Sequence, residues 1–222
     1  MPSEQQPEWV AYELSADSLR LPAVDSPEEF IVDDKLSRSF VTPEDYEGSD
    51  WIPGQLISPE DRAWNRQFRQ ETFLLSTVSP QDPLFRYGIW RELEENVHDW
   101  VREEGKMYVV TGPIFGPEER ATGENQIPVP SYFFKVILDL GRAGKKGIGF
   151  LLPNERSDRP LMDYAGSIRA IEEVTGFDFF HQLTGDPKLE DAIEKYFTPE
   201  LWPVDSVRYQ RRVREWNQKS EF

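Results

Sequence analysis

One long amphipathic stretch, followed by three short apolar runs, limits the folds open to this chain. Between residues 87 and 104, apolar side chains recur at the spacing of one helix face, and Gly105 supplies a stop signal. Apolar runs of strand length follow at residues 107–111, 132–140 and 147–152. Only turn-like residues separate the last two runs, which predicts a hairpin. We therefore expect an α+β fold with an antiparallel sheet core flanked by helices.

Further elements are expected on either side of this central part. Ser58 as N-cap and Pro59 as first helical residue predict a helix that runs to Phe68. The apolar run at residues 72–78 predicts a buried strand, and Pro53 restricts residues 51–57 to an edge or a turn. The remaining expected elements are a strand at 9–14 and helices at 168–175, from 187 to 195, and from 199 or 204 to 217.

Composition excludes several classes of chemistry. The 222 residues include no cysteine, which excludes disulfides, thiolate metal sites and cysteine nucleophiles. The 25 basic and 41 acidic residues give a net charge of −16, and a field of this sign opposes a nucleic-acid polyanion. No apolar run is long enough for a transmembrane helix. No leader is visible at the start of the sequence, although one could have been removed.

Residues 73–100 carry the most specific pattern in the chain. They read FLLSTVSPQDPLFRYGIWRELEENVHDW and resemble the DNA/RNA non-specific endonuclease family, the ββα-metal, endonuclease G-like nucleases. Other blocks similar to the family follow in family order: EWVAYELS at 8–15, MYVVTGPIF at 107–115, IPVPSYFFKVILD at 127–139 and GIGFLLPN at 147–154. The resemblance implies a ββα-metal nuclease-like fold. In an intact member it also implies metal-dependent cleavage of nucleic acid.

The extent of the resemblance suggests three parts of the chain. Residues 1–7 are expected to be a flexible N-terminus, residues 8–183 the endonuclease-like domain, and residues 184–222 a C-terminal helical extension. The extension carries several arginines with interleaved aromatic residues, which can bind nucleic acid. Its ragged apolar stripe favours a docking or partner-binding helix instead, and its basic face could pair with the acidic body.

The catalytic motif departs from the family pattern. The family signature D-R-G-H is replaced by Ile52, Pro53, Gly54 and Gln55 in the segment WIPGQLISP. The resemblance assigns the role of general base to the histidine of that signature. Glutamine has no titratable site near neutral pH, so Gln55 can orient a water molecule but cannot take its proton.

The metal position departs as well. The resemblance implies an asparagine that ligates Mg²⁺, and Arg86 stands at that position. A guanidinium is cationic and has no lone pair to offer an ion. Thr77 replaces a second asparagine of the family pattern, whereas Glu94 matches the helix acid that holds a metal-bound water. One retained acid does not make a metal site, so no metal site is predicted here.

Several side chains in this region allow two interpretations. Arg86 could clamp a phosphate, but an ion pair with Glu94 or Asp50 is favoured. His98 could be a relocated base or ligand, but its position favours the flank of the helix. His181 is expected to be a packed or surface residue. Acids near the degenerate motif could rebuild a metal site, but a solvated acidic loop is favoured: Glu44, Asp45, Glu47, Asp50, Glu60 and Asp61.

These observations lead to one main functional hypothesis and two alternatives. The main hypothesis is a pseudonuclease that uses no cofactor and binds a protein partner or forms a homodimer. Such binding could regulate an active nuclease of the family. The first alternative is a divergent, active, Mg²⁺-dependent endonuclease built on Gln55, Glu94 and nearby carboxylates. The second is a protein that binds nucleic acid without cleaving it. The expected protein is soluble, and the periplasm, secretion and mitochondria stay open as compartments.

Overall fold

A five-stranded antiparallel sheet forms the centre of the molecule. The structure is a computed structural model that describes residues 6–36, 41–118, 120–141, 144–181 and 185–219. The strand order is β1-β4-β7-β8-β9. These strands are β1 (Val10–Ser15), β4 (Lys106–Ile114), β7 (Tyr132–Asp139), β8 (Lys146–Pro153) and β9 (Ala165–Gly166). The expected α+β class and the flanking helices are confirmed.

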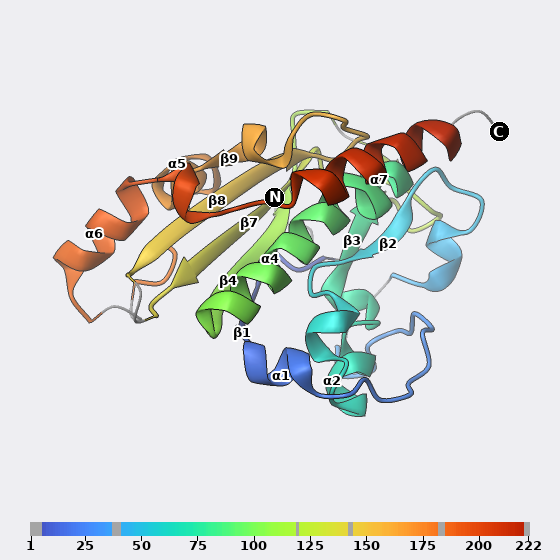
Figure 1. Cartoon of the computed structure of the whole chain (residues 1–222). Helices are drawn as coiled ribbons and strands as arrows, with labels where there is room; N and C mark the ends of the chain where they lie inside the picture. The colour runs from blue at the N-terminus through green and yellow to red at the C-terminus, as the bar shows by residue number, and fades with distance from the viewer. Residues whose placement is uncertain (1–5, 37–40, 119, 142–143, 182–184, 220–222) are drawn as a thin grey trace.

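Helices cover both faces of this sheet (Figure 1). On one face, α4 (Arg91–Glu104) packs on the sheet through a core that includes Trp90, Leu93 and Phe133. On the other face lie α5 (Ile168–Thr175) and α6 (Pro187–Lys195), which share a second core. Because strand residues alternate between faces, Phe133 and Phe134 of β7 enter different cores.

The two strongest sequence predictions agree with this arrangement. β7 and β8 form the expected hairpin, with Asp139 opposite Lys146 at its turn. The helix expected from residue 87 is α-helical from Arg91, and a π-helical turn, η4 (Arg86–Trp90), precedes it. It ends at Gly105, whose φ of 99° suits glycine.

The segment between residues 58 and 81 differs from its prediction. Ser58 and Pro59 start only a 3₁₀ turn, η2 (Pro59–Arg62), and not a helix to Phe68. Asn65 then caps a separate helix, α2 (Arg66–Glu71), by accepting a hydrogen bond from the Phe68 amide. The strand expected at 72–78 is wrong: a turn at residues 72–73, an isolated bridge at Leu74 and a 3₁₀ turn, η3 (Leu75–Thr77), take its place. The strand β3 (Val78–Gln81) begins only at its last residue and pairs with β2 (Ile52–Gln55).

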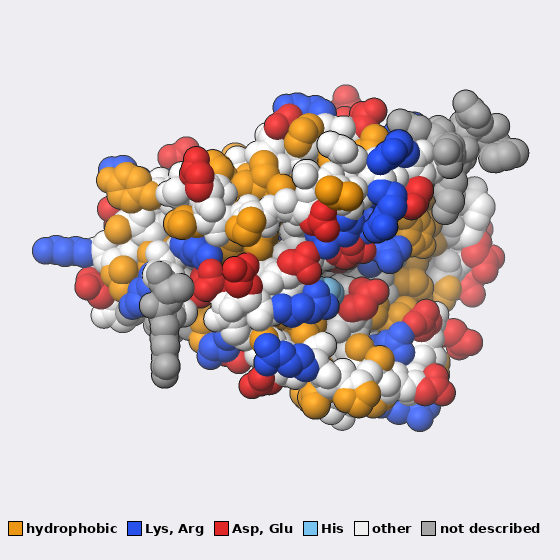
Figure 2. Space-filling view, viewed as in Figure 1, with side chains coloured by type: hydrophobic (Ala, Val, Ile, Leu, Met, Phe, Trp, Pro, Cys, Tyr) orange, Lys and Arg blue, Asp and Glu red, His pale blue; other side chains and the backbone are white. Residues whose placement is uncertain are grey.

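The C-terminal residues pack on the rest of the molecule. Helix α7 (Ser206–Lys219) lies along α4, where basic and acidic side chains interleave on the surface (Figures 1 and 2). Arg208 and Arg212 of α7 form ion pairs with acids of α4, as expected for its basic face: Glu92, Glu95 and Asp99. Trp202, before α7, is fully buried in the α4 core. The division at residue 184 stays a prediction.

The remaining elements are short. They are α1 (Ala16–Arg20), η1 (Pro43–Tyr46), α3 (Pro83–Phe85), β5 (Ala121–Thr122), β6 (Ile127–Pro128), η5 (Leu161–Tyr164) and η6 (Pro199–Leu201). Of the N-terminus expected to be flexible, residues 1–5 lie outside the described residues, while Gln6 donates to the Pro128 carbonyl at 2.6 Å. None of the helices in the described ranges has the length and apolar character needed to cross a membrane.

Candidate functional site

The degenerate motif lies in the two-stranded ribbon of β2 and β3, beside α4. In this ribbon, Gly54 stands opposite Ser79 and Gln55 opposite Val78. Gly54 is buried, and a Cβ atom there would lie 2.1 Å from the Gln81 side chain. Packing against Gln81 therefore requires glycine at this point of the motif, independently of any catalytic role.

A groove of about 640 Å³ runs between this ribbon, the π-helical turn and the start of α4. Ile52, Pro53 and Gln55 line it from β2, and Arg86 and Glu94 line it from the helical side. The structure thus brings together most of the positions that the sequence singled out. They form one site, although they come from segments more than 30 residues apart.

Thr77 is not part of this group. Its hydroxyl donates to the Leu74 carbonyl at 2.9 Å and lies 3.2 Å from the Glu71 carbonyl. Its side chain borders a different cavity, together with Tyr12 and Arg62. Thr77 therefore stabilises the turn before β3, and the structure places it apart from Arg86 and Glu94, where the resemblance locates the metal of the family.

The π-helical turn sets the position of Arg86. The Arg86 amide continues the short helix α3 by donating to the Asp82 carbonyl at 2.9 Å. The turn then widens at Gly88, whose φ of −97° and ψ of −116° are not helical, and resumes as α4. Single π-helical turns of this kind are frequent at functional sites. Here Trp90 enters the core while Arg86 borders the groove.

Arg86 bridges two polar groups of the groove, Glu94 and Gln55. Its Nη1 donates to Glu94 Oε2 at 2.9 Å, and its Nη2 donates to Gln55 Oε1 at 3.4 Å. The Arg86 and Glu94 side chains are only 11% and 6% exposed, so water screens their interaction weakly. The predicted ion pair between Arg86 and Glu94 is confirmed, with Glu94 and not Asp50 as the partner.

Glu94 lies in a buried electrostatic network. Burial raises the pKa of Glu94, and the charges of Arg86 and Lys135 act in the opposite direction. Lys135, on β7, is 1% exposed, and its ammonium group lies 4.7 Å from the centre of the Trp90 ring. Burial lowers the pKa of Lys135, against the attraction of Glu94 and Asp61. The net pKa of Glu94 stays raised, so the two cations offset the effect of burial only in part.

His98 belongs to the same network, contrary to its predicted place on the flank of the helix. Its Nε2 lies 2.5 Å from Asp61 Oδ1, and both residues are buried. Burial lowers the pKa of His98, but the hydrogen bond and charge of Asp61 raise it to a net value above 6.5. The Tyr12 hydroxyl also acts to lower the pKa of Asp61. The prediction of a solvated acidic loop is therefore wrong for Asp61.

The solvated acidic loop is wrong for Asp45 as well. Its side chain is 2% exposed and accepts hydrogen bonds from the Thr42 amide and from Asn125. By contrast, His181 is exposed, which agrees with the surface position that was one of its two expected environments, and it borders a cavity with Trp9.

Lys135 is not among the residues that the sequence predicted for this site. A lysine inside the apolar run FFKVIL is nevertheless a sequence signal of a buried charge.

The groove is close to neutral because its arginines are paired. Arg69 binds Glu28, Arg86 binds Glu94, and Arg91 binds Glu95. A phosphate backbone would have to displace an acid from each of these arginines before it gained a contact. Paired guanidinium groups therefore offer little attraction to a polyanion.

Arg86 stands where the resemblance implies a metal-ligating asparagine, and the residues around it do not fit a metal ion held in that manner. Arg86 offers no lone pair and directs its donors at Glu94 Oε2 and Gln55 Oε1, the oxygens that an ion would need. Glu94 Oε1 has no hydrogen-bond partner within the described part of the chain, which leaves one carboxylate oxygen for a ligand. The positive charge of the Arg86 guanidinium on the same carboxylate would repel a Mg²⁺ ion bound to that oxygen.

The comparison with known protein families shows which family the chain belongs to. A family profile described as DNA/RNA non-specific endonuclease matches residues 2–186. The chain belongs to this family. A solved structure described as "Crystal structure of the EndoG/EndoGI complex: Mechanism of EndoG inhibition" superposes with a TM-score of 0.75 and 27% sequence identity, covering 82% of this chain and 81% of the other. The ββα-metal nuclease-like fold is confirmed.

Curated relatives carry the same family relationship. The chain is 30% identical to mitochondrial endonuclease G of Bos taurus over 77% of this chain and 62% of the relative. It is 30% identical to mitochondrial nuclease EXOG of Xenopus laevis over 93% and 60%, and 31% identical to nuclease C1 of Cunninghamella echinulata over 79% and 76%. The chain thus spans about 60% of the length of the two mitochondrial relatives.

These comparisons correct the prediction that the chain uses no cofactor, which is wrong. The chain belongs to a family of nucleases that depend on a metal ion, typically Mg²⁺. The described residues also include a group of three carboxylates with the spacing to hold an ion: Glu172, Asp178 and Glu194. The misfit at Arg86 concerns one position in the groove and does not extend to the whole protein.

Proposed function

We propose that this chain is a catalytically degenerate member of its family, whose groove serves binding or regulation and does not cleave phosphodiesters. The bridge from Arg86 to Glu94 and Gln55 supports the proposal most directly. Gln55 cannot act as a general base, and the loss of such a base alone costs about 10²–10⁴-fold in rate. Arg86 adds a second loss, because its positive charge stands where the family ligand binds a metal.

A protein is the partner class that the charges favour. The net charge of −16 repels nucleic acid, and the groove arginines are already paired with acids. The superposed EndoG structure is described as a complex that explains inhibition, so a relative of this fold does bind a protein. By analogy, a second copy of this chain or an active nuclease of the family is the proposed partner. Two relatives are mitochondrial by name, which supports that compartment among those left open.

An active metal-dependent endonuclease is the second candidate. The named relatives are nucleases, and three carboxylates line the groove: Glu28, Glu60 and Glu94. A rearranged site would need Arg86 to leave Glu94, so that carboxylate oxygens could face an ion. Cleavage by the natural sequence that EDTA abolishes would select this candidate over the first.

Plasmid and RNA cleavage by the purified protein separates the two candidates. The natural chain is compared with Gln55→His/Arg86→Asn, which restores both family residue types, each with Mg²⁺, Mn²⁺ or EDTA. The matched control is Gln55→His/Arg86→Lys, which gains the imidazole but keeps a cation at the metal position. We expect no cleavage by the natural chain or the control, and metal-dependent cleavage by the first variant. Cleavage by the natural chain at a rate like that of the restored variant would overturn the proposal.

The partner class is tested separately. Light scattering reports whether the chain forms a homodimer, and mixing with an active family nuclease reports whether it alters that enzyme's cleavage rate. Binding to labelled DNA or RNA is measured in parallel between about 50 and 200 mM salt, a range over which counterion release weakens nucleic-acid binding. A stable protein complex without salt-sensitive nucleic-acid binding agrees with the proposal. Strongly salt-sensitive binding would favour a non-cleaving nucleic-acid-binding protein.

A further inference from the structure

Three carboxylates meet on the face of the sheet opposite to α4, away from the groove. Glu172 comes from α5, Asp178 from the segment after it, and Glu194 from α6. Each offers an oxygen atom, and these atoms all lie within 4.8 Å of one another. Like charges at this spacing repel, so the arrangement needs a compensating positive charge.

Glu194 gives this group a feature that a solvated acidic cluster lacks. The residue is only 5% exposed, and its Oε1 atom has no hydrogen-bond partner among the described residues. Its other oxygen, Oε2, accepts from Arg169 Nη2 at 2.8 Å. A buried carboxylate oxygen without a partner is costly and calls for a ligand. The Glu194 carboxylate faces the oxygens of Glu172 and Asp178.

Arg169 compensates the group only in part. Its Nη2 is shared between Glu194 and Asp191, which lies 3.0 Å away, and its Nε is 3.6 Å from Glu172 Oε2. Among the described residues, Arg169 forms no ion pair with Asp178, so it does not neutralise the charge of that carboxylate. One guanidinium therefore faces several carboxylates, and the local charge stays negative.

The helix geometry adds to this imbalance. Glu172 and Glu194 both lie in the last turn of their helices, α5 and α6. The carboxyl end of a helix carries partial negative charge, which disfavours acidic side chains and favours cations. Burial, followed by the charge of Glu172, raises the pKa of Glu194 to about 7. A bound cation would offset the negative charge at the two helix ends and would favour the charged form of Glu194.

We infer that Glu172, Asp178 and Glu194 form a binding site for a divalent cation, with Ca²⁺ as the best-matched ion. All three ligands are carboxylate oxygens, which hard cations prefer. Ca²⁺ binds oxygen at about 2.3–2.6 Å, so opposite ligands stand about 5 Å apart, in agreement with the observed spacing. Glu172 also accepts from the Phe179 amide at 2.8 Å, which orients its carboxylate.

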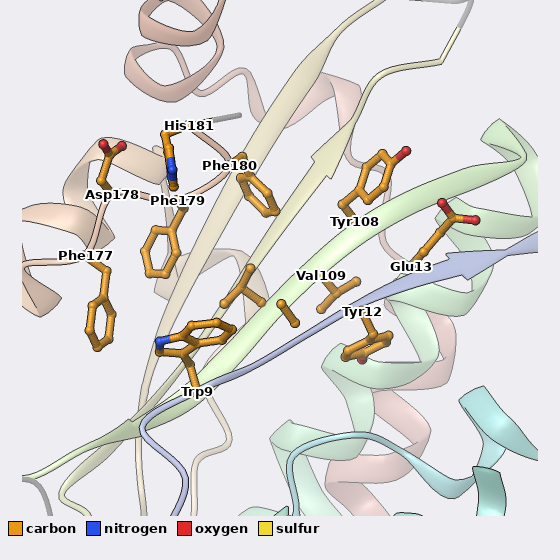
Figure 3. Close-up of a pocket in the computed structure, with 12 residues that line it drawn as sticks. Trp9, Tyr12, Glu13, Tyr108, Val109, Phe177, Asp178, Phe179, Phe180 and His181 are labelled. Carbon is orange, nitrogen blue, oxygen red and sulfur yellow. The ribbon is translucent and has the colours of Figure 1, made fainter. Parts of the chain in front are cut away.

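The site would join two helices to the segment between them. Figure 3 shows that the carboxylate of Asp178 points away from the ring of its neighbour Phe177. Phe177 and Phe179 pack with Phe134 of the sheet, so the same segment contributes to the core. A cation on Asp178 would therefore fasten this segment to α5 and α6, and its effect would appear as added stability.

Thermal unfolding and calorimetric titration test the site in the full chain after treatment with a chelator. With a dissociation constant of about 10⁻⁴ M, 10 mM CaCl₂ should raise the Tm by about 5–10 °C over NaCl of equal ionic strength. Asp178→Asn and Glu194→Gln should each reduce Ca²⁺ affinity at least about tenfold. The matched control is Asp191→Asn, which alters a neighbouring partner of Arg169 but none of the three ligands, and should keep the shift.

Two outcomes would overturn the inference. One is no calorimetric binding and no Tm shift with CaCl₂. The other is a shift that Asp178→Asn and Glu194→Gln retain in full, since the ion would then act elsewhere. Because Asp178 is exposed, its variant is expected to fold, so a loss of the Ca²⁺ response there reports on the site itself. Neither result depends on nuclease activity.

Discussion

The guanidinium of Arg86 and the carboxylate of Glu94 meet at 2.9 Å, eight residues apart on the helical segment that borders the groove. Both side chains are nearly buried, and Lys135 lies within electrostatic reach of Glu94. In a low-dielectric environment, removing either member of such a pair leaves the other as an uncompensated buried charge, which destabilises the fold. The pair therefore links the chemistry of the groove to the stability of the fold.

Removing Arg86 should be costly at neutral pH. Arg86→Ala leaves the buried Glu94 carboxylate with less compensation, and we expect the free energy of unfolding to fall by about 3–5 kcal/mol. Adding Glu94→Gln should recover much of this loss, because the uncompensated charge is then gone. Urea unfolding of the single and double variants measures both effects. The control is Arg91→Ala, which breaks the ion pair with Glu95. Because the Arg91 side chain is 54% exposed, this change should lower the free energy of unfolding by at most about 1 kcal/mol.

The sequence predicts local features of this fold well and buried long-range pairs poorly. The β7–β8 hairpin and α4 depend on periodicity and on a stop at Gly105, which adjacent residues encode. The pair of Asp61 and His98 joins residues 37 positions apart, so periodicity alone places His98 on a helix flank. In the groove, alignment to the family located Gln55, Arg86 and Glu94, but only the structure shows that Arg86 contacts both others.

The Asp61–His98 pair predicts a defined pH window. Relative to unfolded values of 3.8 and 6.5, the pKa of Asp61 is lowered and the pKa of His98 is raised. The Asp61 contribution is therefore complete above pH 3.8 and is lost as pH falls through its folded pKa. The His98 contribution is complete below pH 6.5 and is lost as pH rises through its folded pKa. Both act together between these values.

Urea unfolding of the natural chain and of His98→Gln between pH 3 and 9 tests this window. The difference in unfolding free energy should be largest between pH 3.8 and 6.5 and shrink on either side. His181→Gln, at an exposed histidine, is the control and should change little across the range. A difference that rises as the pH approaches 6.5 and then stays high would mean that His98 is neutral in the folded protein.

The ion pairs between α7 and α4 predict that α7 is held by charge. Arg212 binds Glu92 at 2.6 Å and also contacts Glu95, and Glu92 is only 1% exposed. Arg212→Ala should lower the unfolding free energy by about 1–3 kcal/mol, with Arg208 retaining part of the compensation. It should also speed amide hydrogen exchange in α7. Arg211→Ala, at an exposed position of the same helix, is the control. Equal exchange rates in the two variants would contradict this account.

Trp202 tests whether the C-terminal residues unfold with the rest of the molecule. It is 1% exposed, its ring centre lies 5.0 Å from that of Trp100 in an edge-to-face contact, and the Trp100 indole donates to the Pro203 carbonyl at 2.7 Å. Trp202→Ala should cost about 3–5 kcal/mol through the cavity that it leaves. If residues 184–222 share one cooperative core with α4, near-UV and far-UV circular dichroism should report a single transition at a lower urea midpoint. Two separated transitions, with the main one unchanged, would instead support an independent extension that begins near residue 184, because the α4 core would then be stable without the indole of Trp202.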